Sequence, residues 1–508
     1  MKKFLFAFLL LLSACSLQIN PTPTPVPTIS VPRIVMVVAT PTLTPTFTPT
    51  ATRTPTNTPT ATRTPTPTLT PSPTPVPTDT PTPDPYALRA TLGNSRSVPR
   101  AAALKISAPA HLQISPWMFG TNYWVAPFGK DTRQELAPLN LTVLRWGGEN
   151  LDTEKFEWSD LDRFILNARL LNMEPLIQVP YYSSEPAFAA RMVRYVNVEK
   201  KYDVRFWGIG NEEDKNLRSG FKEKWIQSWR SYRDAMKAVD PRILLFGPEY
   251  ASLYDFTKPE QDWLTPFLRV NGDAVDVISL HRYPFNGNQA NINVVMRDAT
   301  GTTARVRALR AHIQNITGRD IPLAFTEMNL SSDWRKEGAG SSASFTAGLW
   351  LAETLGQMAE AGVAMVNVWS AANDGSMSLL EPKTLNRRPT FYALQLYANY
   401  GDRIVPAASH VSNVSVHAAR DSRTGNVTIV LVNRGNTDAD LRLVLNSGEE
   451  QKQGNIYFDL GARKRIRYTL PAYSMVSFSL DKQLSRTRTL LYSRALYDAK
   501  QEPVYTTP

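Results

Sequence analysis

The sequence predicts an α/β protein built on a (β/α)8 TIM barrel, followed by a C-terminal antiparallel β-sandwich domain and preceded by a Thr/Pro-rich stalk. Two observations favour the barrel over residues 101–400: short apolar runs alternate there with helical patterns, and eight such runs can be counted. The alternative is a doubly wound sheet. No Gly-rich phosphate loop follows the first apolar run, which argues against it.

The eight predicted strands are short, apolar and spaced for intervening helices. They are Met118–Trp124, Thr142–Trp146, Pro175–Pro180, Val204–Ile209, Ile243–Gly247, Val275–Leu280, Pro322–Thr326 and Ala364–Trp369. The clearest helical pattern lies at Asp160–Leu171, where apolar residues recur at intervals of three and four. Similar patterns predict helices at Phe221–Val239, Thr303–Ile316, Ser344–Ala361 and Thr390–Asn399.

Beyond residue 400 the pattern changes to short alternating runs separated by turn residues, which predicts a β-sandwich domain over residues 401–482. Residues 483–508 form a basic tail for which no regular structure is predicted, and Lys105–Ile114 is a candidate extra strand. The predicted sandwich strands are Val411–Arg420, Asn426–Asn433, Asp440–Leu445, Asn455–Phe458, Arg465–Leu470 and Ser474–Leu480.

Composition limits the class of protein. The chain has 508 residues, and 42% of them are hydrophobic, enough for a sizeable core. The net charge is +11, but Lys and Arg are scattered and no nucleic-acid-binding motif is present, which disfavours a nucleic-acid partner. No His, Asp or Glu group has metal-ligand spacing in the sequence, so neither a metal nor another cofactor is expected.

The N-terminus has the pattern of a secretory signal. Lys2 and Lys3 precede the apolar stretch Phe4–Leu12, which is too short to span a bilayer. Leu12-Ser13-Ala14-Cys15 resembles the lipobox of bacterial lipoproteins, which implies removal of residues 1–14 and lipidation of Cys15. The alternative is an ordinary signal peptide with Cys15 incidental. Cys15 is the only cysteine, so a disulfide framework is excluded.

Residues 15–100 are predicted to be a disordered linker, consisting mostly of Thr and Pro. Proline fixes φ and removes amide donors, and the segment has few apolar residues to bury, so we expect an extended stalk. Such a stalk would hold the folded part of a bacterial surface lipoprotein away from the membrane. The composition also suits O-glycosylation.

Two glutamates follow predicted strands in positions suited to catalysis. Glu212 ends the fourth strand region and Glu327 the seventh. In a TIM barrel the C-terminal strand ends meet at one face, and two facing carboxylates are the apparatus for cleaving a glycosidic bond. A strand-end glutamate is otherwise a helix cap or an ion-pair partner. Glu149, Glu213 and Glu249 are expected to be solvated or supporting, with Glu249 the alternative catalytic group.

The chain resembles clan A glycoside hydrolases, a retaining (β/α)8 group, and within it family 44, the endoglucanases and xyloglucanases. Glu149 interrupts a Gly-Gly-Asn run usual in that family, and Arg282 stands where an aromatic residue or Asp is expected, so families 39, 51 and 30 remain open. The matching segments are Gly120-Thr121-Asn122-Tyr123, Arg145-Trp146-Gly147-Gly148, Trp207-Gly208-Ile209-Gly210-Asn211-Glu212, Asp276 to Pro284, and Thr326-Glu327-Met328-Asn329.

The resemblance implies that Glu327 is the nucleophile and Glu212 the acid/base. Ionised Glu327 and burial are expected to raise the pKa of Glu212, while Arg145 and Tyr283 support Glu327. His281 either orients a carboxylate or is structural. Asn211 is expected to bond the sugar 2-hydroxyl, and Trp369 to form the floor of the site. Trp124, Trp146 and Tyr181 are expected to stack on other sugars, although Trp146 is as readily a core residue. The predicted substrate-binding residues are Asn122, Trp124, Arg145, Trp146, Tyr181, Asn211, His281, Tyr283 and Trp369.

The predicted function is therefore a surface-anchored retaining glycosidase that cleaves β-linked polysaccharide of the β-glucan or xyloglucan type and acts as a monomer. Two alternatives are kept. The first is a non-catalytic carbohydrate-binding lipoprotein on a degenerate barrel, which the presence of Glu212 and Glu327 disfavours. The second is a transglycosylase that uses the same site.

Overall fold

The computed structural model describes most of residues 113–507. The predicted signal sequence, Cys15, the Thr/Pro stalk, nearly all of the extra strand candidate, and Trp124 lie outside the described residues. Among the described residues no helix combines the length and apolar character needed to cross a bilayer. The described residues are 113–123, 128–149, 157–182, 184–215, 218, 220–251, 262–335, 337–372, 375–446 and 448–507.

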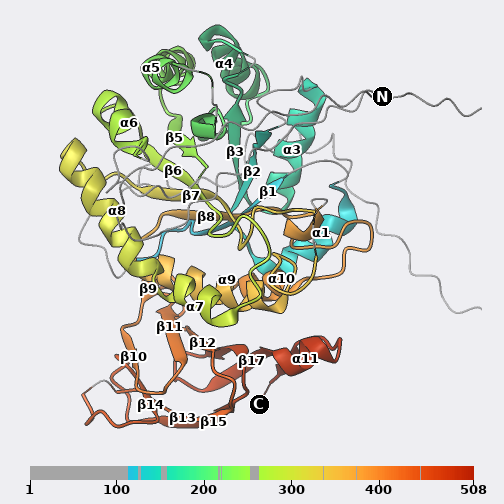
Figure 1. Cartoon of the computed structure of the whole chain (residues 1–508), viewed down its shortest axis with the longest axis vertical. Helices are drawn as coiled ribbons and strands as arrows, with labels where there is room; N and C mark the ends of the chain where they lie inside the picture. The colour runs from blue at the N-terminus through green and yellow to red at the C-terminus, as the bar shows by residue number, and fades with distance from the viewer. Residues whose placement is uncertain are drawn as a thin grey trace, which may run out of the picture. The chain divides into compact units, whose positions relative to one another are not determined.

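Eight parallel strands close into a barrel in sequence order, which confirms the predicted fold (Figure 1). Each forms where an apolar run was predicted. All eight strands are buried along their whole length, except for a partly exposed first residue in the first and fifth strands. The strands are β1 Phe119–Tyr123, β2 Val143–Trp146, β3 Glu174–Val179, β4 Phe206–Ile209, β5 Leu244–Tyr250, β6 Val277–Arg282, β7 Leu323–Met328 and β8 Met365–Val368.

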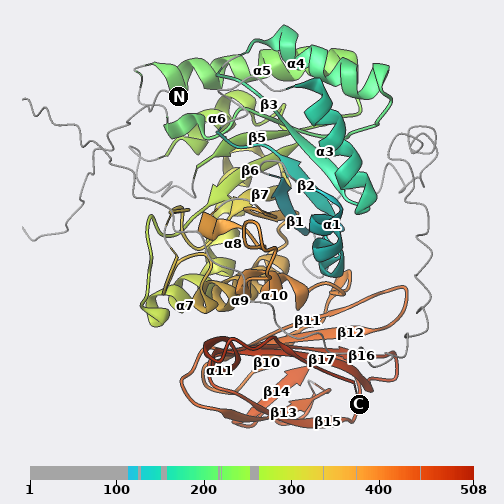
Figure 2. The same cartoon turned by 90° about the vertical axis from the view of Figure 1, so that its right-hand side faces the viewer.

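Helices surround the barrel, and the five predicted from apolar periodicity are all present (Figures 1 and 2). Short turns of 3-10 helix lie at Ala137–Leu139, Glu213–Lys215 and Gly375–Met377, and a π-helical turn at Arg194–Glu199. The α-helices of this part are α1 Lys130–Leu136, α3 Trp158–Leu170, α4 Pro186–Val193, α5 Phe221–Val239, α6 Leu264–Asn271, α7 Ile292–Thr300, α8 Thr302–Thr317, α9 Phe345–Glu360 and α10 Pro389–Gln395.

An apolar layer fills the barrel at the start of its strands. Four of its members, Val143, Phe206, Val277 and Met365, are the first residues of β2, β4, β6 and β8. Because this layer closes the lower end of the barrel, inward-pointing polar side chains are confined to the opposite end, where the strands finish. The complete layer comprises Trp117, Val143, Leu176, Phe206, Phe246, Val277, Ala324 and Met365.

The C-terminal region forms two sheets that share an apolar core, so it is a sandwich (Figure 2). One sheet has the order β18-β17-β16-β12-β11-β9 and the other β10-β14-β13-β15; the pairs are antiparallel except β13 with β14. The strands are β9 Arg403–Ile404, β10 Ala407–Ser409, β11 Val414–Arg420, β12 Val427–Asn433, β13 Ala439–Val444, β14 Asn455–Phe458, β15 Arg465–Leu470, β16 Ser474–Leu480, β17 Arg486–Ser493 and β18 Val504–Thr506, with helix α11 at Arg494–Asp498.

Residues beyond 482, for which no regular structure was predicted, thus extend the larger sheet through β17 and β18. The larger sheet faces α9 of the barrel. There His417 of β11 lies 2.8 Å from Glu360, and a Cβ on Gly356 would sit 2.1 Å from the His417 ring. A glycine is required at position 356 for this close approach, which fixes the sandwich against the barrel.

Candidate active site

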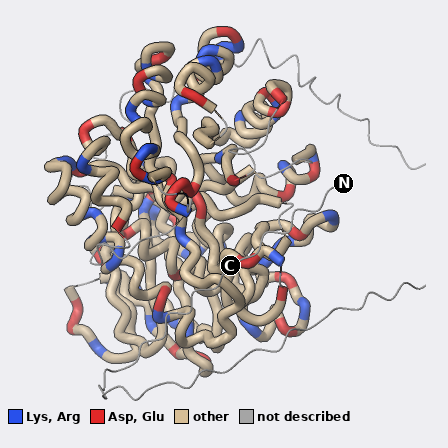
Figure 3. The backbone as a smooth tube through the Cα atoms, turned by 45° about the horizontal axis from the view of Figure 1, so that its top comes forward, with Lys and Arg blue, Asp and Glu red and all other residues tan. Residues whose placement is uncertain are grey.

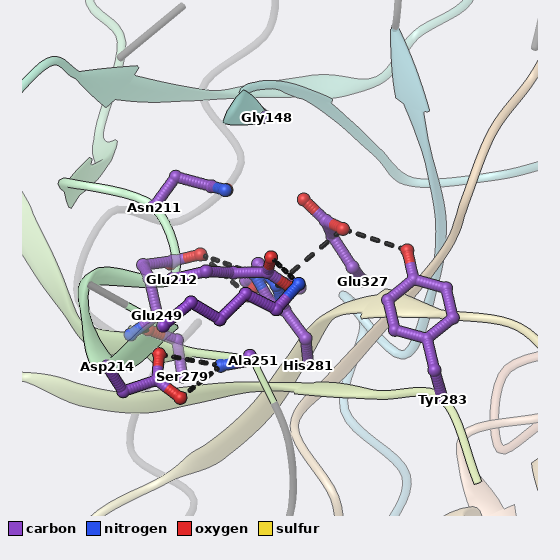
Figure 4. Close-up of polar contacts among 12 residues, drawn as sticks. Gly148, Asn211, Glu212, Asp214, Glu249, Ala251, Ser279, His281, Tyr283 and Glu327 are labelled. Atoms are coloured by element: carbon purple, nitrogen blue, oxygen red, sulfur yellow. Dashed lines mark hydrogen bonds and ion pairs between the residues drawn. The ribbon is translucent and has the colours of Figure 1, made fainter. Parts of the chain in front are cut away.

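The polar side chains at the strand ends converge on one cluster. Arg145 is contributed by β2, Glu249 by β5, His281 by β6 and Glu327 by β7, and Glu212 follows β4. Figure 4 shows Glu212 and Glu327 entering from opposite sides, with His281 between them. The barrel thus brings together residues that are far apart in sequence, as expected for C-terminal strand ends.

Glu212 and Glu327 face each other at short range. An oxygen of each carboxylate and a ring nitrogen of His281 all lie within 4.8 Å of one another. Both carboxylates are largely enclosed, with side-chain exposures of 11% for Glu212 and 7% for Glu327. Retaining glycosidases have their two carboxyl groups about 5–5.5 Å apart, whereas inverting ones have them about 6.5–9.5 Å apart. The spacing here matches the shorter class.

Arg145 is the central cation of the cluster and is almost fully buried. Its Nη1 donates to Glu327 Oε1 at 2.9 Å, and its Nη2 donates to Glu249 Oε2 and to Asn211 Oδ1, both at 3.0 Å. A Cβ on Gly147 would lie 2.5 Å from the guanidinium carbon, so this position leaves no room for a side chain. Arg145 therefore links three strand ends and holds Glu327 in place.

Tyr283 is the second support of Glu327. Its hydroxyl donates to Glu327 Oε2 at 2.8 Å, so each oxygen of the carboxylate has its own donor (Figure 4). The expected support of Glu327 by Arg145 and Tyr283 is present in the structure. These two bonds fix the orientation of the carboxylate.

Glu249 is a supporting residue and is fully buried. Its Oε2 accepts from Thr326 at 2.8 Å and from Arg145, while its backbone oxygen accepts from the Glu212 amide at 2.9 Å. Its φ is +57°, in the left-handed region, as is that of Glu212 at +56°. Burial raises the pKa of Glu249, but the charges of Arg145 and His281 lower it to about 2. A permanently ionised, enclosed Glu249 cannot reach a substrate and instead anchors the cations.

His281 bridges all three carboxylates. Its Nδ1 lies 2.8 Å from Glu212 Oε1 and 3.6 Å from Glu327 Oε2, and its Nε2 lies 3.2 Å from Glu249 Oε2. Burial lowers the pKa of His281, but the charge of Glu327 and the bonds to Glu212 and Glu249 raise it to about 9. His281 is therefore an imidazolium that donates from both nitrogens and orients the catalytic pair.

The expected rise in the pKa of Glu212 is wrong for this state of the protein. Burial does raise it, but the hydrogen bond from His281 and the charge of Lys215 lower it, and the pKa is about 2. Lys215, three residues further along the chain, contacts Glu212 Oε2 directly. The sequence argument included the carboxylate neighbour and omitted these two cations.

The charges of the cluster are balanced. Three carboxylates, Glu212, Glu249 and Glu327, are matched by the cations Arg145, His281 and Lys215. Within the described residues, Glu212, His281 and Glu327 are the one group whose donor atoms could surround a metal ion. A divalent cation there would meet protonated His281 and the other two cations, so the donor set does not suit one.

Several predicted sugar-binding residues are enclosed by protein. Asn122 is fully buried, where it accepts from Arg145 at 3.2 Å and donates to the Thr326 carbonyl at 3.1 Å. Trp146 stacks on Phe164 with ring centres 5.8 Å apart. Tyr181 bonds Ser228 at 2.8 Å. These three side chains are thus buried against protein partners, and the stacking roles expected of Trp146 and Tyr181 stay predictions.

Asn211 and Trp369 occupy the ends of β4 and β8 as predicted. Asn211 is buried beside Glu212, where its oxygen accepts from Arg145, and its position on a sugar 2-hydroxyl stays a prediction. Trp369 is 6% exposed, so its surface toward a ligand is small. Its backbone carbonyl accepts from Asn329 of the β7 end, which joins the last two strands of the barrel.

Sequence reasoning missed Lys215 and Gln178. Gln178 of β3 accepts from the Gly148 amide at 2.7 Å and from Arg145 at 3.4 Å, which ties the β2 loop to β3. The alternation of β3 places Gln178 toward the barrel interior and could have indicated it. The signal for Lys215 was a cation one helical turn after Glu212.

No known family model matches the chain. Among curated proteins it is similar to α-L-arabinofuranosidase C of Emericella nidulans, with 22% identity over 336 residues, 54% of this chain and 65% of the relative. A probable α-L-arabinofuranosidase C of Aspergillus fumigatus is 21% identical over 338 residues. The chain thus spans 65% of the length of each of these relatives.

Solved structures share the fold. The α-L-arabinofuranosidase of Thermotoga maritima, in complex with arabinose, superposes with a TM-score of 0.55 at 16% identity, covering 72% of this chain and 94% of that one. A family 44 xyloglucanase of Paenibacillus polymyxa gives a TM-score of 0.52 at 14% identity, covering 72% and 96%. Structures of families 51 and 44 match to a similar extent, so the narrower resemblance to family 44 gains no support over family 51.

Proposed function

We propose that this protein is a retaining glycoside hydrolase of clan A. The observation that carries the proposal is the pair Glu212 and Glu327, with carboxylate oxygens within 4.8 Å of each other in a barrel shared with known glycosidases. The support around Glu327 agrees with a nucleophile, because Arg145 and Tyr283 fix both of its oxygens. Glu212 has the more exposed partner, Lys215, which a substrate can displace when Glu212 acts as acid/base.

In the first step Glu327 attacks the anomeric carbon and forms the glycosyl–enzyme bond, while the bond to the leaving oxygen breaks and Glu212 gives that oxygen its proton. In the second step Glu212 takes a proton from water, which attacks the anomeric carbon and releases Glu327. The leaving oxygen needs the edge of Glu212 that Lys215 occupies in the free protein. Displacing Lys215 removes a cation from Glu212 and so raises its pKa toward that of a proton donor.

For the substrate we propose α-L-arabinofuranosides of plant-type polysaccharide. Curated relatives and solved neighbours named α-L-arabinofuranosidases support this class. The second candidate is a β-linked glucan such as xyloglucan, which the motifs resembling family 44 and the Paenibacillus polymyxa neighbour support. A sugar acceptor can take the place of water in the second step, so transglycosylation is a variant of the same proposal.

The test is hydrolysis of a panel: an aryl α-L-arabinofuranoside, arabinan, arabinoxylan, xyloglucan and mixed-linkage β-glucan, with product sizing and an added acceptor. Glu327→Gln is the inactive control, and Arg163→Gln, an exposed residue of α3, is the matched control for a charge change elsewhere. We expect the wild type and Arg163→Gln to cleave one class of substrate in the panel, and Glu327→Gln to cleave none. Binding without cleavage by the wild type would favour a carbohydrate-binding lipoprotein instead.

We also propose that the protein is a monomer anchored at the bacterial cell surface by a lipid on Cys15. The support is the lipobox-like Leu12-Ser13-Ala14-Cys15 and the Thr/Pro stretch after it. Labelling with a fatty-acid analogue in a bacterial host tests this. Label in the wild type and none in Cys15→Ser is expected, whereas equal release of both into the medium would contradict it.

A further inference from the structure

Three cations follow the acid/base Glu212 within ten residues along the chain, and we call Lys215, Arg218 and Lys222 the basic ledge. They belong to the connection from β4 to α5 and to the first turn of α5. Among residues 213–224, the cations at the surface are the three of the ledge and Lys224. Glu223 is the one anion of this segment at the surface, because Glu213 and Asp214 are buried. The ledge is therefore locally positive, although Figure 3 shows charges of both signs interspersed over the tube as a whole.

One exposed and one partly buried aromatic ring accompany the ledge. The Arg218 guanidinium lies 5.3 Å from the centre of the Tyr182 ring, and Tyr182 is 41% exposed. The Lys222 ammonium lies 4.0 Å from the centre of the Trp263 ring. Tyr182 follows β3 and Trp263 precedes α6, so the rings flank the end of β4 on both sides. Aromatic faces next to cations suit sugars that carry both apolar ring faces and negative charge.

Lys215 connects the ledge to the reaction. Its side chain is 62% exposed, yet its ammonium contacts Glu212 Oε2. The acid/base delivers its proton to the leaving oxygen, so the sugar beyond the cleaved bond lies on the Glu212 side. Any group that draws the Lys215 ammonium outward frees the proton-donating edge of Glu212. A carboxylate on the leaving-group sugar would do so, because it offers the ammonium a replacement partner.

On the basis of the proposed glycosidase function, we propose that the basic ledge binds a hexuronic acid unit on the leaving-group side of the cleaved bond. The natural substrate is then an acidic polysaccharide. The sugar carboxylate pairs with Lys215, with Arg218 and Lys222 holding neighbouring carboxylates and the Tyr182 ring lying against a sugar face. Binding of the acidic unit and release of Glu212 from Lys215 occur together, so the ledge selects acidic substrates over neutral ones.

The test compares acidic polysaccharides with themselves after chemical reduction of their carboxylates to alcohols, a change that leaves the linkages intact. The variants are Arg218→Gln and Lys222→Gln, singly and together, with Lys452→Gln of the sandwich domain as the matched charge change far from the barrel end. Lys452 is 66% exposed, so this control keeps the fold. Carboxylate pairing of this kind is worth up to roughly a fivefold change in KM per cation.

We expect kcat/KM of the wild type to be about tenfold or more higher on the acidic form than on the reduced form. Because Lys215 remains, the double variant is expected to keep only the part of this preference that Lys215 supplies, whereas Lys452→Gln retains all of it. Affinity electrophoresis of Glu327→Gln in gels containing the acidic polymer gives a second readout, with retardation abolished by the two ledge substitutions.

Equal rates of wild type and double variant on both forms would overturn the ledge proposal and leave the glycosidase proposal standing. No hydrolysis of either form, or of the neutral panel, would overturn the glycosidase proposal. Retardation that survives both ledge substitutions would place polymer binding elsewhere and would also overturn the ledge proposal.

Discussion

His281 Nδ1 lies 2.8 Å from Glu212 Oε1, so the imidazole at the end of β6 determines the charge of the carboxylate at the end of β4. The same nitrogen is 3.6 Å from Glu327 Oε2. One buried cation is therefore shared by the two members of the proposed catalytic pair. The charge state of the whole cluster depends on this proton and on the removable cation Lys215.

His281 makes stability depend on pH on the alkaline side. Its pKa is raised from 6.5 to about 9, so its stabilising contribution is complete below pH 6.5 and is lost as pH rises through 9. The loss amounts to about 3 kcal/mol. His417 acts in the same direction with a pKa of about 10. Urea unfolding between pH 6 and pH 10 should show a decline that is reduced in His281→Asn.

His417→Asn is the control for that experiment, because it removes the second buried histidine and should leave the fall between about pH 6.5 and pH 9 in place. If His281→Asn and the wild type lost stability in parallel over the whole range, the shared-imidazolium description of the cluster would be wrong.

Lys215 holds Glu212 ionised in the free protein, so Lys215→Met is expected to raise the pKa of Glu212 above about 2. In this variant His281 remains as a cation next to Glu212. Burial raises the pKa of the nearby Asp214 to about 6, so Asp214 adds a negative charge as pH increases. Because Glu212 must be protonated to act as the acid, the alkaline limb of kcat/KM should move up by about one pH unit. An unchanged profile would show that Lys215 does not govern the acid.

Arg145 is the main structural cation of the site. Arg145→Met leaves Glu249 and Glu327 without their common partner in a buried position, which should lower the free energy of unfolding by about 3–5 kcal/mol. Arg145→Lys keeps the charge and loses the fork that reaches both carboxylates, so its loss should be smaller. Denaturant titration measures both.

Arg163→Met is the exposed counterpart, since Arg163 pairs with Asp160 on the surface and its removal should cost less than about 1 kcal/mol. Comparable losses in Arg145→Met and Arg163→Met would contradict the central role given to Arg145.

Much of the fold was predictable because apolar runs mark the barrel strands and helical spacing marks α5 so clearly that its predicted and observed bounds agree. The directions in which the β2 side chains point could also be predicted from the sequence. Neighbouring strand residues point to opposite faces, so an inward Arg145 requires an outward Trp146. β17 belongs to the larger sheet of the sandwich. It was missed because Arg486, Thr487 and Arg488 obscure the alternation of apolar and polar residues by which a strand is predicted.

Other features of the site depend on contacts that spacing does not show. Glu249 is buried because positive φ at that residue directs its side chain to Arg145 and Thr326. The low pKa of Glu212 depends on a proton on His281, which in turn depends on three carboxylates from three strands. The sequence identified the charged members of the cluster apart from Lys215, and their coupling required the structure.

The central claim is that Glu327 is the nucleophile and Glu212 the acid/base of a double displacement. The most direct measurement is the anomeric configuration, by proton NMR, of the glycosyl azide formed from an activated aryl glycoside by Glu212→Ala and by Glu327→Ala. Azide replaces water on the glycosyl–enzyme in the first variant and replaces the nucleophile in the second. We predict retained configuration with Glu212→Ala and inverted configuration with Glu327→Ala. The opposite assignment, or inversion by the wild type, would contradict the account.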